Sequence, residues 1–360
     1  MRLRFKQLLA LALALTLLCT AFAGCGKVDG NSDNGTKRTV TDMAGQTVEL
    51  PETVEKVFCD WASGITLVMT LGATEKLVAV PAAFETDTFA WAQEICPKIK
   101  DIQKDDAPFT NVEVVLNYSP DLIITNNKDN IDTYKNLGLT AVYVNYNSND
   151  SFKESMSIVG TALGADEKAA ADRYNTYFDE NVKLVEKRLA SISAEDKPSV
   201  YYMDSRFGDA YHTVGTGEIQ EEWVTIAGGV LVTAAEFEGR NLEITAEKLL
   251  WLDPDIILIG AQKQAEVYDL LMADKVLAGM SAIKNNSVYR VPQGIFPWCR
   301  TGPEAAMQVV WAAKLFYPEQ FSDIDIAEMA KSFYKDFYGT DVSLDSINGI
   351  LAGKMFPEGK

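Results

Sequence analysis

Short runs of consecutive apolar residues alternate along the chain with segments whose apolar positions have helical spacing. The clearest pattern is an internal repeat, in which a glutamate stands seven residues before a Pro-Asp pair and an apolar run follows the pair. The repeat occupies 113–125 and 247–259, with Glu113 and Glu247 as its glutamates. An apolar run without polar alternation predicts a strand covered on both faces, as in a parallel sheet between helices. Two such units predict two α/β lobes.

Other segments predict further elements of the same kind. We expect strands at 56–59, 77–80, 141–144, 199–203 and 287–291, and helices at 62–71, 218–227 and 302–316. The stretch 166–191 contains no Gly or Pro and keeps helical spacing of its apolar residues. At ~1.5 Å per residue this single helix would span roughly 40 Å, enough to run along both lobes as a rigid connection.

The first residues have the pattern of an export signal. Three cations, Arg2, Arg4 and Lys6, precede an apolar run that ends near Gly24, as in a secretory leader. Residues 22–25 resemble the lipobox of bacterial lipoproteins, although Phe22 stands where leucine is usual, so Cys25 is predicted to be lipidated. Cleavage after an Ala-x-Ala site is the alternative, and it would leave Cys25 free. The polar stretch that follows is typical of a flexible tether.

These boundaries predict an extracytoplasmic protein held to a membrane surface by a lipid. The predicted parts are a leader at 1–24, a tether at 25–38, an N-terminal α/β lobe at 39–165, an interlobe helix at 166–193 and a C-terminal α/β lobe at 194–360.

Composition excludes several classes of function. The formal net charge of −18 disfavours binding to nucleic acid, which is itself an anion. The chain has one histidine, His212, so it has no cluster of imidazoles for a transition metal. Beyond Cys19 and Cys25 only Cys59, Cys96 and Cys299 remain, which permits one disulfide at most.

The order of several motifs resembles the iron-complex and cobalamin substrate-binding proteins of ABC importers. The resemblance extends from Thr39 to the end of the chain and rests on 39–51, 71–80, both Pro-Asp units, 291–304 and 311–319. It implies two Rossmann-like lobes with parallel sheets, joined by one long helix, with the ligand in the cleft between them. The implied function is capture of a ferric siderophore, haem or a corrinoid by a monomer, for delivery to a dimeric permease.

The rival interpretations are a ligand-sensing surface lipoprotein and an exported enzyme that acts on a metal chelate. Against an enzyme, the chain has no G-x-S-x-G, P-loop or G-x-G-x-x-G motif. No catalytic residue and no resident cofactor are therefore predicted.

Ligands of open parallel sheets bind beyond the carboxyl ends of the strands. The loops at those ends are rich in aromatic residues and contain two arginines, which suit an aromatic or carboxylate-bearing ligand. The predicted ligand-binding residues are Trp61, Phe84, Arg206, Phe207, Tyr211, Trp298 and Arg300. The alternatives are that the rings close the cores and that the arginines form structural ion pairs.

Two further assignments concern one histidine and a pair of glutamates. His212 follows a predicted strand and is a candidate axial ligand of haem iron, although a structural hydrogen-bonded histidine is the commoner case. The resemblance implies that Glu113 and Glu247 dock into arginines of the permease. For Glu113 the alternative is a capping box that begins at Thr110.

Overall fold

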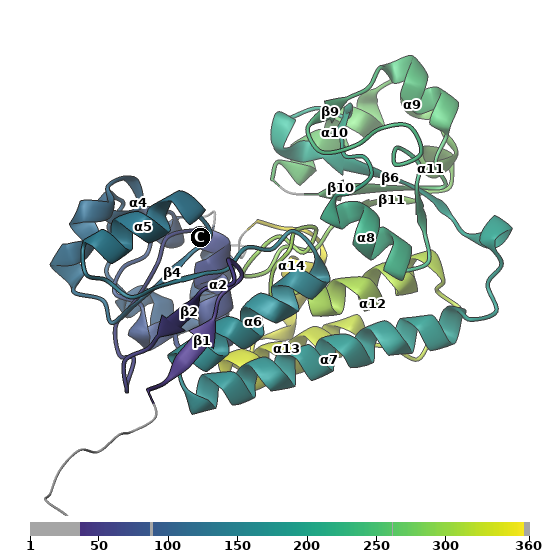
Figure 1. Ribbon diagram of the computed structural model, residues 1–360. Helices are drawn as coiled ribbons and strands as arrows, with labels where there is room; N and C mark the ends of the chain where they lie inside the picture. The colour runs from purple at the N-terminus through teal and green to yellow at the C-terminus, as the bar shows by residue number, and fades with distance from the viewer. Residues whose placement is uncertain (1–36, 87–88, 261, 356–360) are drawn as a thin grey trace, which may run out of the picture. The chain divides into compact units, whose positions relative to one another are not determined.

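Two separate parallel sheets form the framework of the protein (Figure 1). The computed structural model describes residues 37–86, 89–260 and 262–355. The first sheet has the order β3-β4-β5, with β3 (Val57–Cys59), β4 (Leu122–Thr125) and β5 (Ala141–Tyr143). The second has the order β11-β10-β6-β8, with β6 (Ser199–Asp204), β8 (Val230–Leu231), β10 (Ile256–Gly260) and β11 (Val288–Arg290). The predicted α/β fold with two lobes is confirmed.

The central strands are apolar because helices cover both of their faces. Every residue of β4 and of β10 is buried. In the first sheet Ile123 is in register with Phe58 on one side and Ala141 on the other. In the second, Leu258 lies between Tyr202 and Tyr289. The parallel register brings the carboxyl ends of the strands in each sheet to one edge.

The internal repeat of the sequence is also a repeat of structure. In each unit the residue before the proline, Ser119 or Asp253, has a positive φ, of 47° and 34° respectively, which ends the preceding helix. The aspartate after the proline then binds the start of the neighbouring strand. Asp121 accepts from the backbone N–H of Lys56 at 2.9 Å, and Asp255 accepts from that of Ser199 at 2.8 Å.

The remaining elements surround the sheets. In the N-terminal half these are β1 (Thr39–Thr41), β2 (Thr47–Glu49), α2 (Ala62–Thr70), α3 (Ala90–Ile95), α4 (Ala107–Thr110), α5 (Lys128–Asn136) and α6 (Asn149–Leu163). In the C-terminal half they are β7 (His212–Thr213), α8 (Ile219–Ile226), β9 (Leu242–Glu243), α9 (Ala246–Leu252), α10 (Gln264–Ala273), α11 (Ser281–Lys284), α12 (Ala305–Phe316), α13 (Ile326–Tyr338) and α14 (Leu344–Leu351). Short 3-10 helices are η1 (Thr74–Lys76), η2 (Ala82–Glu85), η4 (Pro97–Asp101), η5 (Val112–Tyr118), η6 (Ala194–Asp196), η7 (Ser205–Phe207) and η8 (Leu277–Gly279).

The helix between the two sheets, α7 (Ala165–Leu189), is continuous over 25 residues. It begins one residue before the predicted segment 166–191 and ends two residues before that segment does. At the N-terminal side Gly160 of α6 lets the helices approach closely, since a Cβ there would lie 2.9 Å from that of Ala171. Farther along, the Tyr174 hydroxyl donates to Pro303 O and the Asn181 amide donates to Ala306 O, both at 2.8 Å.

One hydrophobic core extends through both halves. It includes buried residues of both sheets and the faces of α7, α12 and α13 that meet beside α6 in Figure 1. Two smaller clusters lie on the outer faces of the sheets, one in each half. Because α7 and α12 contribute to the same core, the two sheets pack against one shared hydrophobic core.

One expected strand is formed only in part. The predicted strand 77–80 forms only isolated bridges, between Leu77 and Val57 and between Val80 and Lys104.

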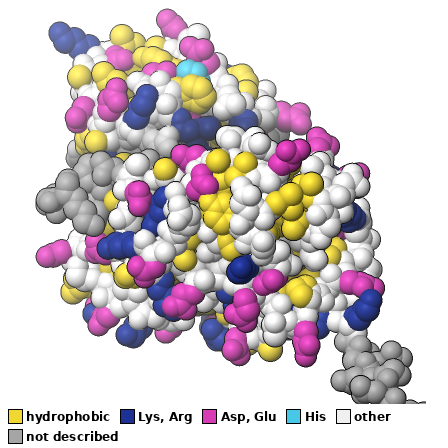
Figure 2. Space-filling view, turned by 90° about the vertical axis from the view of Figure 1, so that its left-hand side faces the viewer, with side chains coloured by type: hydrophobic (Ala, Val, Ile, Leu, Met, Phe, Trp, Pro, Cys, Tyr) yellow, Lys and Arg dark blue, Asp and Glu magenta, His cyan; other side chains and the backbone are white. Residues whose placement is uncertain are grey.

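The leader at 1–24 and Cys25 lie outside the described residues. Within the described part of the chain, no helix is long and apolar enough to cross a membrane. Acidic side chains are spread widely over the face shown in Figure 2.

Candidate functional site

A cleft of about 350 Å³ lies where strand ends of both sheets meet. On the N-terminal side it is lined by residues that follow β3, β4 and β5. On the C-terminal side it is lined by residues at the end of β6 and just after it, by residues of 214–220, by Arg240 and by the loop between β11 and α12. Its lining is Trp61, Ser63, Asn126, Tyr146, Asn147, Tyr202, Asp204, Arg206, Val214, Glu218, Ile219, Gln220, Arg240, Phe296, Arg300 and Thr301. This is the position expected for a ligand of open parallel sheets.

The N-terminal wall of the cleft is aromatic and uncharged. The rings of Trp61 and Tyr146 lie 6.1 Å apart, and the Tyr146 hydroxyl forms a hydrogen bond of 2.9 Å with Ser63 Oγ. Burial raises the pKa of Tyr146, so its hydroxyl remains protonated. Gly64 is required beside this wall, because a Cβ there would lie 2.6 Å from the Trp61 ring. Ser63 Oγ also lies 3.3 Å from Thr301 O, which belongs to the opposite wall.

The C-terminal wall contains all the charges of the cleft. Arg206 pairs with Asp204, its Nε donating to the two carboxylate oxygens at 2.8 and 3.0 Å. Arg240 Nε lies 3.3 Å from Glu218 Oε1. Arg300 differs from both, because no described residue forms an ion pair or a hydrogen bond with its guanidinium. The cleft therefore has one arginine that is available to a ligand.

The loop that presents Arg300 is fixed from below by a buried carboxylate. Glu304 is 1% exposed, and its Oε1 accepts from Ile295 N at 2.7 Å and lies 3.5 Å from the Tyr334 hydroxyl. Gly294 leaves room for this contact, since a Cβ there would lie 2.3 Å from Glu304 Oε1. Burial raises the pKa of Glu304 to about 7.

A model of the family described as "Periplasmic binding protein" matches residues 61–294, which is more than half of the chain. The chain belongs to this family. Membership confirms the resemblance found in the sequence and the role of the protein in binding a solute for an ABC importer.

Two characterised relatives cover most of this binding protein. The molybdate-binding protein MolA of Haemophilus influenzae is 22% identical over 334 residues, which are 86% of this chain and 93% of MolA. The Fe(3+)-citrate-binding protein YfmC of Bacillus subtilis is 22% identical over 306 residues, 80% of this chain and 90% of YfmC. A periplasmic solute binding protein from Veillonella parvula has the same fold, with a TM-score of 0.76 at 20% identity over 87% of this chain and 96% of the other. These relatives are binding proteins.

Three of the predicted ligand-binding residues come together in the cleft of the binding protein, namely Trp61, Arg206 and Arg300. Two others are corrected by the structure. Phe84 has no exposed surface and stacks on Phe89 with centroids 4.1 Å apart, and Trp298 is 1% exposed. These rings belong to the core, where full burial removes more apolar area from water than a cleft wall allows.

Phe207 and Tyr211 follow β6, as predicted, but are not part of the cleft lining. Phe207 is 43% exposed and stacks on His212, with centroids 3.9 Å apart. The Tyr211 hydroxyl donates to Asp274 Oδ2 at 3.1 Å, on the outer side of the second sheet. His212 Nδ1 lies 2.8 Å from Asp209 Oδ1. The structural alternative for His212 thus matches its contacts better than axial ligation of haem does.

No group of three or more His, Cys, Asp or Glu side chains in the described part of the structure is arranged to hold a metal ion. Cys59, Cys96 and Cys299 are all buried, and none of the three forms a disulfide with another.

Sequence reasoning missed two lining residues that a simple signal identifies. Tyr146 and Asn147 follow β5, so the rule that selected the other strand ends applies equally to them. Arg240 also lines the cleft, but it lies far from any strand end that the sequence predicted. No local pattern marks it.

Glu113 and Glu247 occupy equivalent places in the two halves. Glu113 is the second residue of η5, whose N-cap is Asn111, and Glu247 is the second residue of α9, whose N-cap is Thr245. Both side chains are exposed. The alternative of a capping box from Thr110 is wrong, because the Asn111 side chain, not that of Thr110, accepts from Glu113 N.

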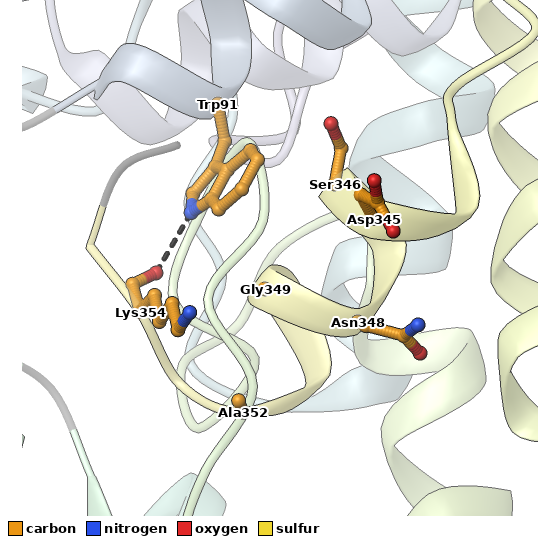
Figure 3. Close-up of a pocket in the computed structure, with 7 residues that line it drawn as sticks. All are labelled: Trp91, Asp345, Ser346, Asn348, Gly349, Ala352 and Lys354. Atoms are coloured by element: carbon orange, nitrogen blue, oxygen red, sulfur yellow. Dashed lines mark hydrogen bonds between the residues drawn. The ribbon is translucent and has the colours of Figure 1, made fainter. Parts of the chain in front are cut away.

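A second cavity, of about 530 Å³, lies between α3 and α14 (Figure 3). It is lined by Trp91, Asp345, Ser346, Asn348, Gly349, Ala352 and Lys354. Trp91 Nε1 donates to Lys354 O at 2.7 Å, which ties the segment after α14 to the N-terminal half. This cavity is larger than the cleft, but it contains none of the predicted ligand-binding residues.

The buried Glu304 predicts a specific dependence of stability on pH. Its pKa is raised from 4.5 to about 7, so the native state holds this proton more tightly than the unfolded chain does. Stability from this group is greatest at low pH and is lost as the pH rises through 7, by about 3 kcal/mol in all. Glu304→Gln is neutral at every pH. We expect the difference in unfolding free energy between Glu304→Gln and the wild type to grow in favour of the variant between pH 5 and pH 8, as measured by denaturant unfolding.

Glu319→Gln, at an exposed position on the surface, is the matched control. A difference for Glu304→Gln that stays constant from pH 5 to pH 8 would contradict the assignment.

Proposed function

We propose that this protein captures a compact iron complex that presents carboxylate oxygens, and that it delivers this complex to the permease of an ABC importer. The observation that carries the proposal is the unpaired guanidinium of Arg300 in a cleft with an aromatic wall. An arginine offers a planar pair of N–H donors that matches a carboxylate. A relative named for binding Fe(3+)-citrate supports the same ligand class.

The size of the cleft separates the ligands that the sequence left open. A volume of about 350 Å³ is at the lower end of small-molecule sites, which range over about 300–1,000 Å³. This favours a small ferric chelate over the macrocycles haem and corrinoid. In this proposal the metal arrives with its chelator and is the transported solute, so the protein needs no resident cofactor and performs no catalytic step.

A metal oxyanion such as molybdate is the second candidate. It is favoured by the extent of the match to a molybdate-binding protein, which covers 93% of that relative. The cleft also places hydroxyl and amide groups of Ser63, Asn126 and Tyr146 opposite Arg300. Such groups donate hydrogen bonds to oxyanions.

We further propose that Glu113 and Glu247 dock the two halves onto the two subunits of the permease. The support is their equivalence, because each is an exposed glutamate at the second position of the helix before a Pro-Asp pair. Backbone and Thr245 hydrogen bonds lower the pKa of Glu247, which keeps its carboxylate ionised. Two carboxylates on separate halves give recognition at two points, which fixes orientation and register.

The position of the protein outside the cytoplasm follows from its family. We propose that a lipid on Cys25 holds it at the membrane, on the strength of the leader and lipobox-like sequence at 22–25. Several acyl chains give stable anchoring, since each buried methylene contributes roughly 0.8 kcal/mol.

Ligand binding is tested by titrating tryptophan fluorescence of the mature protein with ferric citrate, molybdate, haemin and cyanocobalamin. We expect ferric citrate to bind most tightly, and Arg300→Met to weaken that binding about tenfold or more, as for loss of a charged hydrogen bond. Arg188→Met is the control, because Arg188 pairs with Asp323 away from the cleft. Tightest binding of molybdate would select the second candidate. Binding of neither ferric citrate nor molybdate, or an Arg300→Met variant equal to the wild type, would reject the proposal.

Docking is tested by the double variant Glu113→Ala with Glu247→Ala. We expect uptake of the radiolabelled ligand by cells to be abolished, while the ligand affinity of the purified protein changes less than twofold. The matched control removes the exposed Glu52 and Glu266, one in each half, and should leave uptake intact. Uptake at the wild-type rate in the double variant, or a loss of ligand affinity, would contradict docking through these residues.

The anchor is tested by Cys25→Ala in cells. We expect the variant protein to leave the membrane fraction and appear in the soluble extracytoplasmic fraction, with the ligand affinity of the wild type. A variant that stays with the membrane would show that Cys25 is not the point of attachment.

A further inference from the structure

Arg206 and Arg300 both line the cleft, but they differ in the acceptors that their guanidinium groups already contact. Arg206 Nε donates to both oxygens of Asp204, and its Nη2 donates to Asp204 Oδ2 and also to Asn241 Oδ1 at 3.2 Å. Asp204 is itself 3% exposed, whereas the Arg206 side chain is 34% exposed. The Arg206 guanidinium carbon also lies 5.5 Å from the centre of the Phe207 ring.

These contacts leave Arg206 without a free pair of donors. The edge formed by Nε and Nη2 is closed by Asp204, and the other edge retains only Nη1, because Nη2 is shared with Asn241. A carboxylate needs two parallel N–H groups on one edge for bidentate binding. Arg300, in contrast, has both edges available among the described residues.

Arg240 does not take the place of Arg206 as a partner for an anionic group of the ligand. Its side chain is 63% exposed, and it pairs at 3.3 Å with Glu218. A charge at such a rim is screened by solvent and contributes little to affinity.

The N-terminal wall contributes no charged side chain to the cleft. Its lining residues are Trp61, Ser63, Asn126, Tyr146 and Asn147. Three arginines and two carboxylates line the cleft, so its formal charge is one net positive charge. Ion pairing with anionic groups is thus confined to the C-terminal wall, and within that wall to one unoccupied guanidinium.

We propose that Asp204 is a specificity-determining residue of the cleft. By holding Arg206, it limits the sheltered part of the cleft to a single arginine fork, and so it selects complexes that present one carboxylate or one oxyanion face there over complexes that present two. This inference rests on the proposed function, because it assumes that the cleft is where the anionic solute binds.

Two substitutions change the negative charge next to Arg206 in opposite directions. Asp204→Asn keeps the shape of the side chain and one acceptor for Arg206, but it removes the carboxylate that occupies the guanidinium. Asn241→Asp adds a carboxylate next to Arg206 Nη2, and an aspartate tolerates the positive φ of 58° at this position. Both variants leave Arg300 untouched.

The test measures the affinity of the wild type and both variants for ferric citrate, for metal-free citrate and for a ferric hydroxamate without free carboxylates. Asp204→Asn should bind ferric citrate and citrate about tenfold more tightly, which corresponds to one added charged hydrogen bond. Asn241→Asp should bind both more weakly than the wild type. Affinity for the hydroxamate should change less than twofold in both variants. Asp209→Asn is the matched control, because Asp209 is in the same loop but pairs with His212.

The outcomes separate the inference from the proposed function. If the wild type binds neither ferric citrate nor molybdate, the proposed function fails, and the citrate titrations then decide the inference. Equal or weaker citrate binding by Asp204→Asn, with its melting temperature unchanged, overturns the role of Asp204. If Asp204→Asn does not fold, Asn241→Asp decides alone, and citrate affinity equal to or above that of the wild type overturns the inference.

Discussion

The packing of α7 against α12 and α13 is the constraint on which the rest of the structure depends. Tyr174, at the centre of this packing, is fully buried, contacts Phe337 with centroids 5.7 Å apart and donates to Pro303 O at 2.8 Å. Pro303 immediately precedes the start of α12, so a residue of the interlobe helix directly holds the end of the loop that lines the cleft. Since the same core continues into both sheets, the two sets of strand ends are held facing one cleft.

This arrangement explains why the loop between β11 and α12 can present a charged residue. A loop that reaches into a cleft needs support beneath it, and here the support is Glu304, which accepts from Ile295 N. Burial of this side chain is costly, because only Oε1 accepts hydrogen bonds and Oε2 has no partner among the described residues. Arg300, four residues earlier in the chain, is then fixed at its backbone by the hydrogen bond from its N–H to Pro297 O, while its guanidinium stays available.

The two walls of the cleft differ in the kinds of side chain that they contribute. The N-terminal wall supplies flat aromatic surface and neutral donors, and the C-terminal wall supplies charge. The division also means that small changes on one wall, such as the pairing of Arg206 with Asp204, alter the charge of the whole site. Members of one family can in this way bind different solutes with the same fold.

The sequence by itself determined the elements and their order. The apolar runs after each Pro-Asp pair and the unbroken spacing of 166–191 identified both sheets and α7, because burial on two faces and helical periodicity leave a direct pattern in the residues. The strand ends also indicated Trp61, Arg206 and Arg300, since a parallel sheet brings those ends together. The tertiary structure alone decided which aromatic side chains line the cleft. Phe84 and Trp298 are aromatic residues in loops, as Trp61 is, yet their rings are buried. The side of a loop on which a ring packs depends on contacts distant in sequence. The same reason applies to the hydrogen bond from Arg206 to Asn241, which spans 35 residues, whereas the ion pair of Arg206 with Asp204 is local.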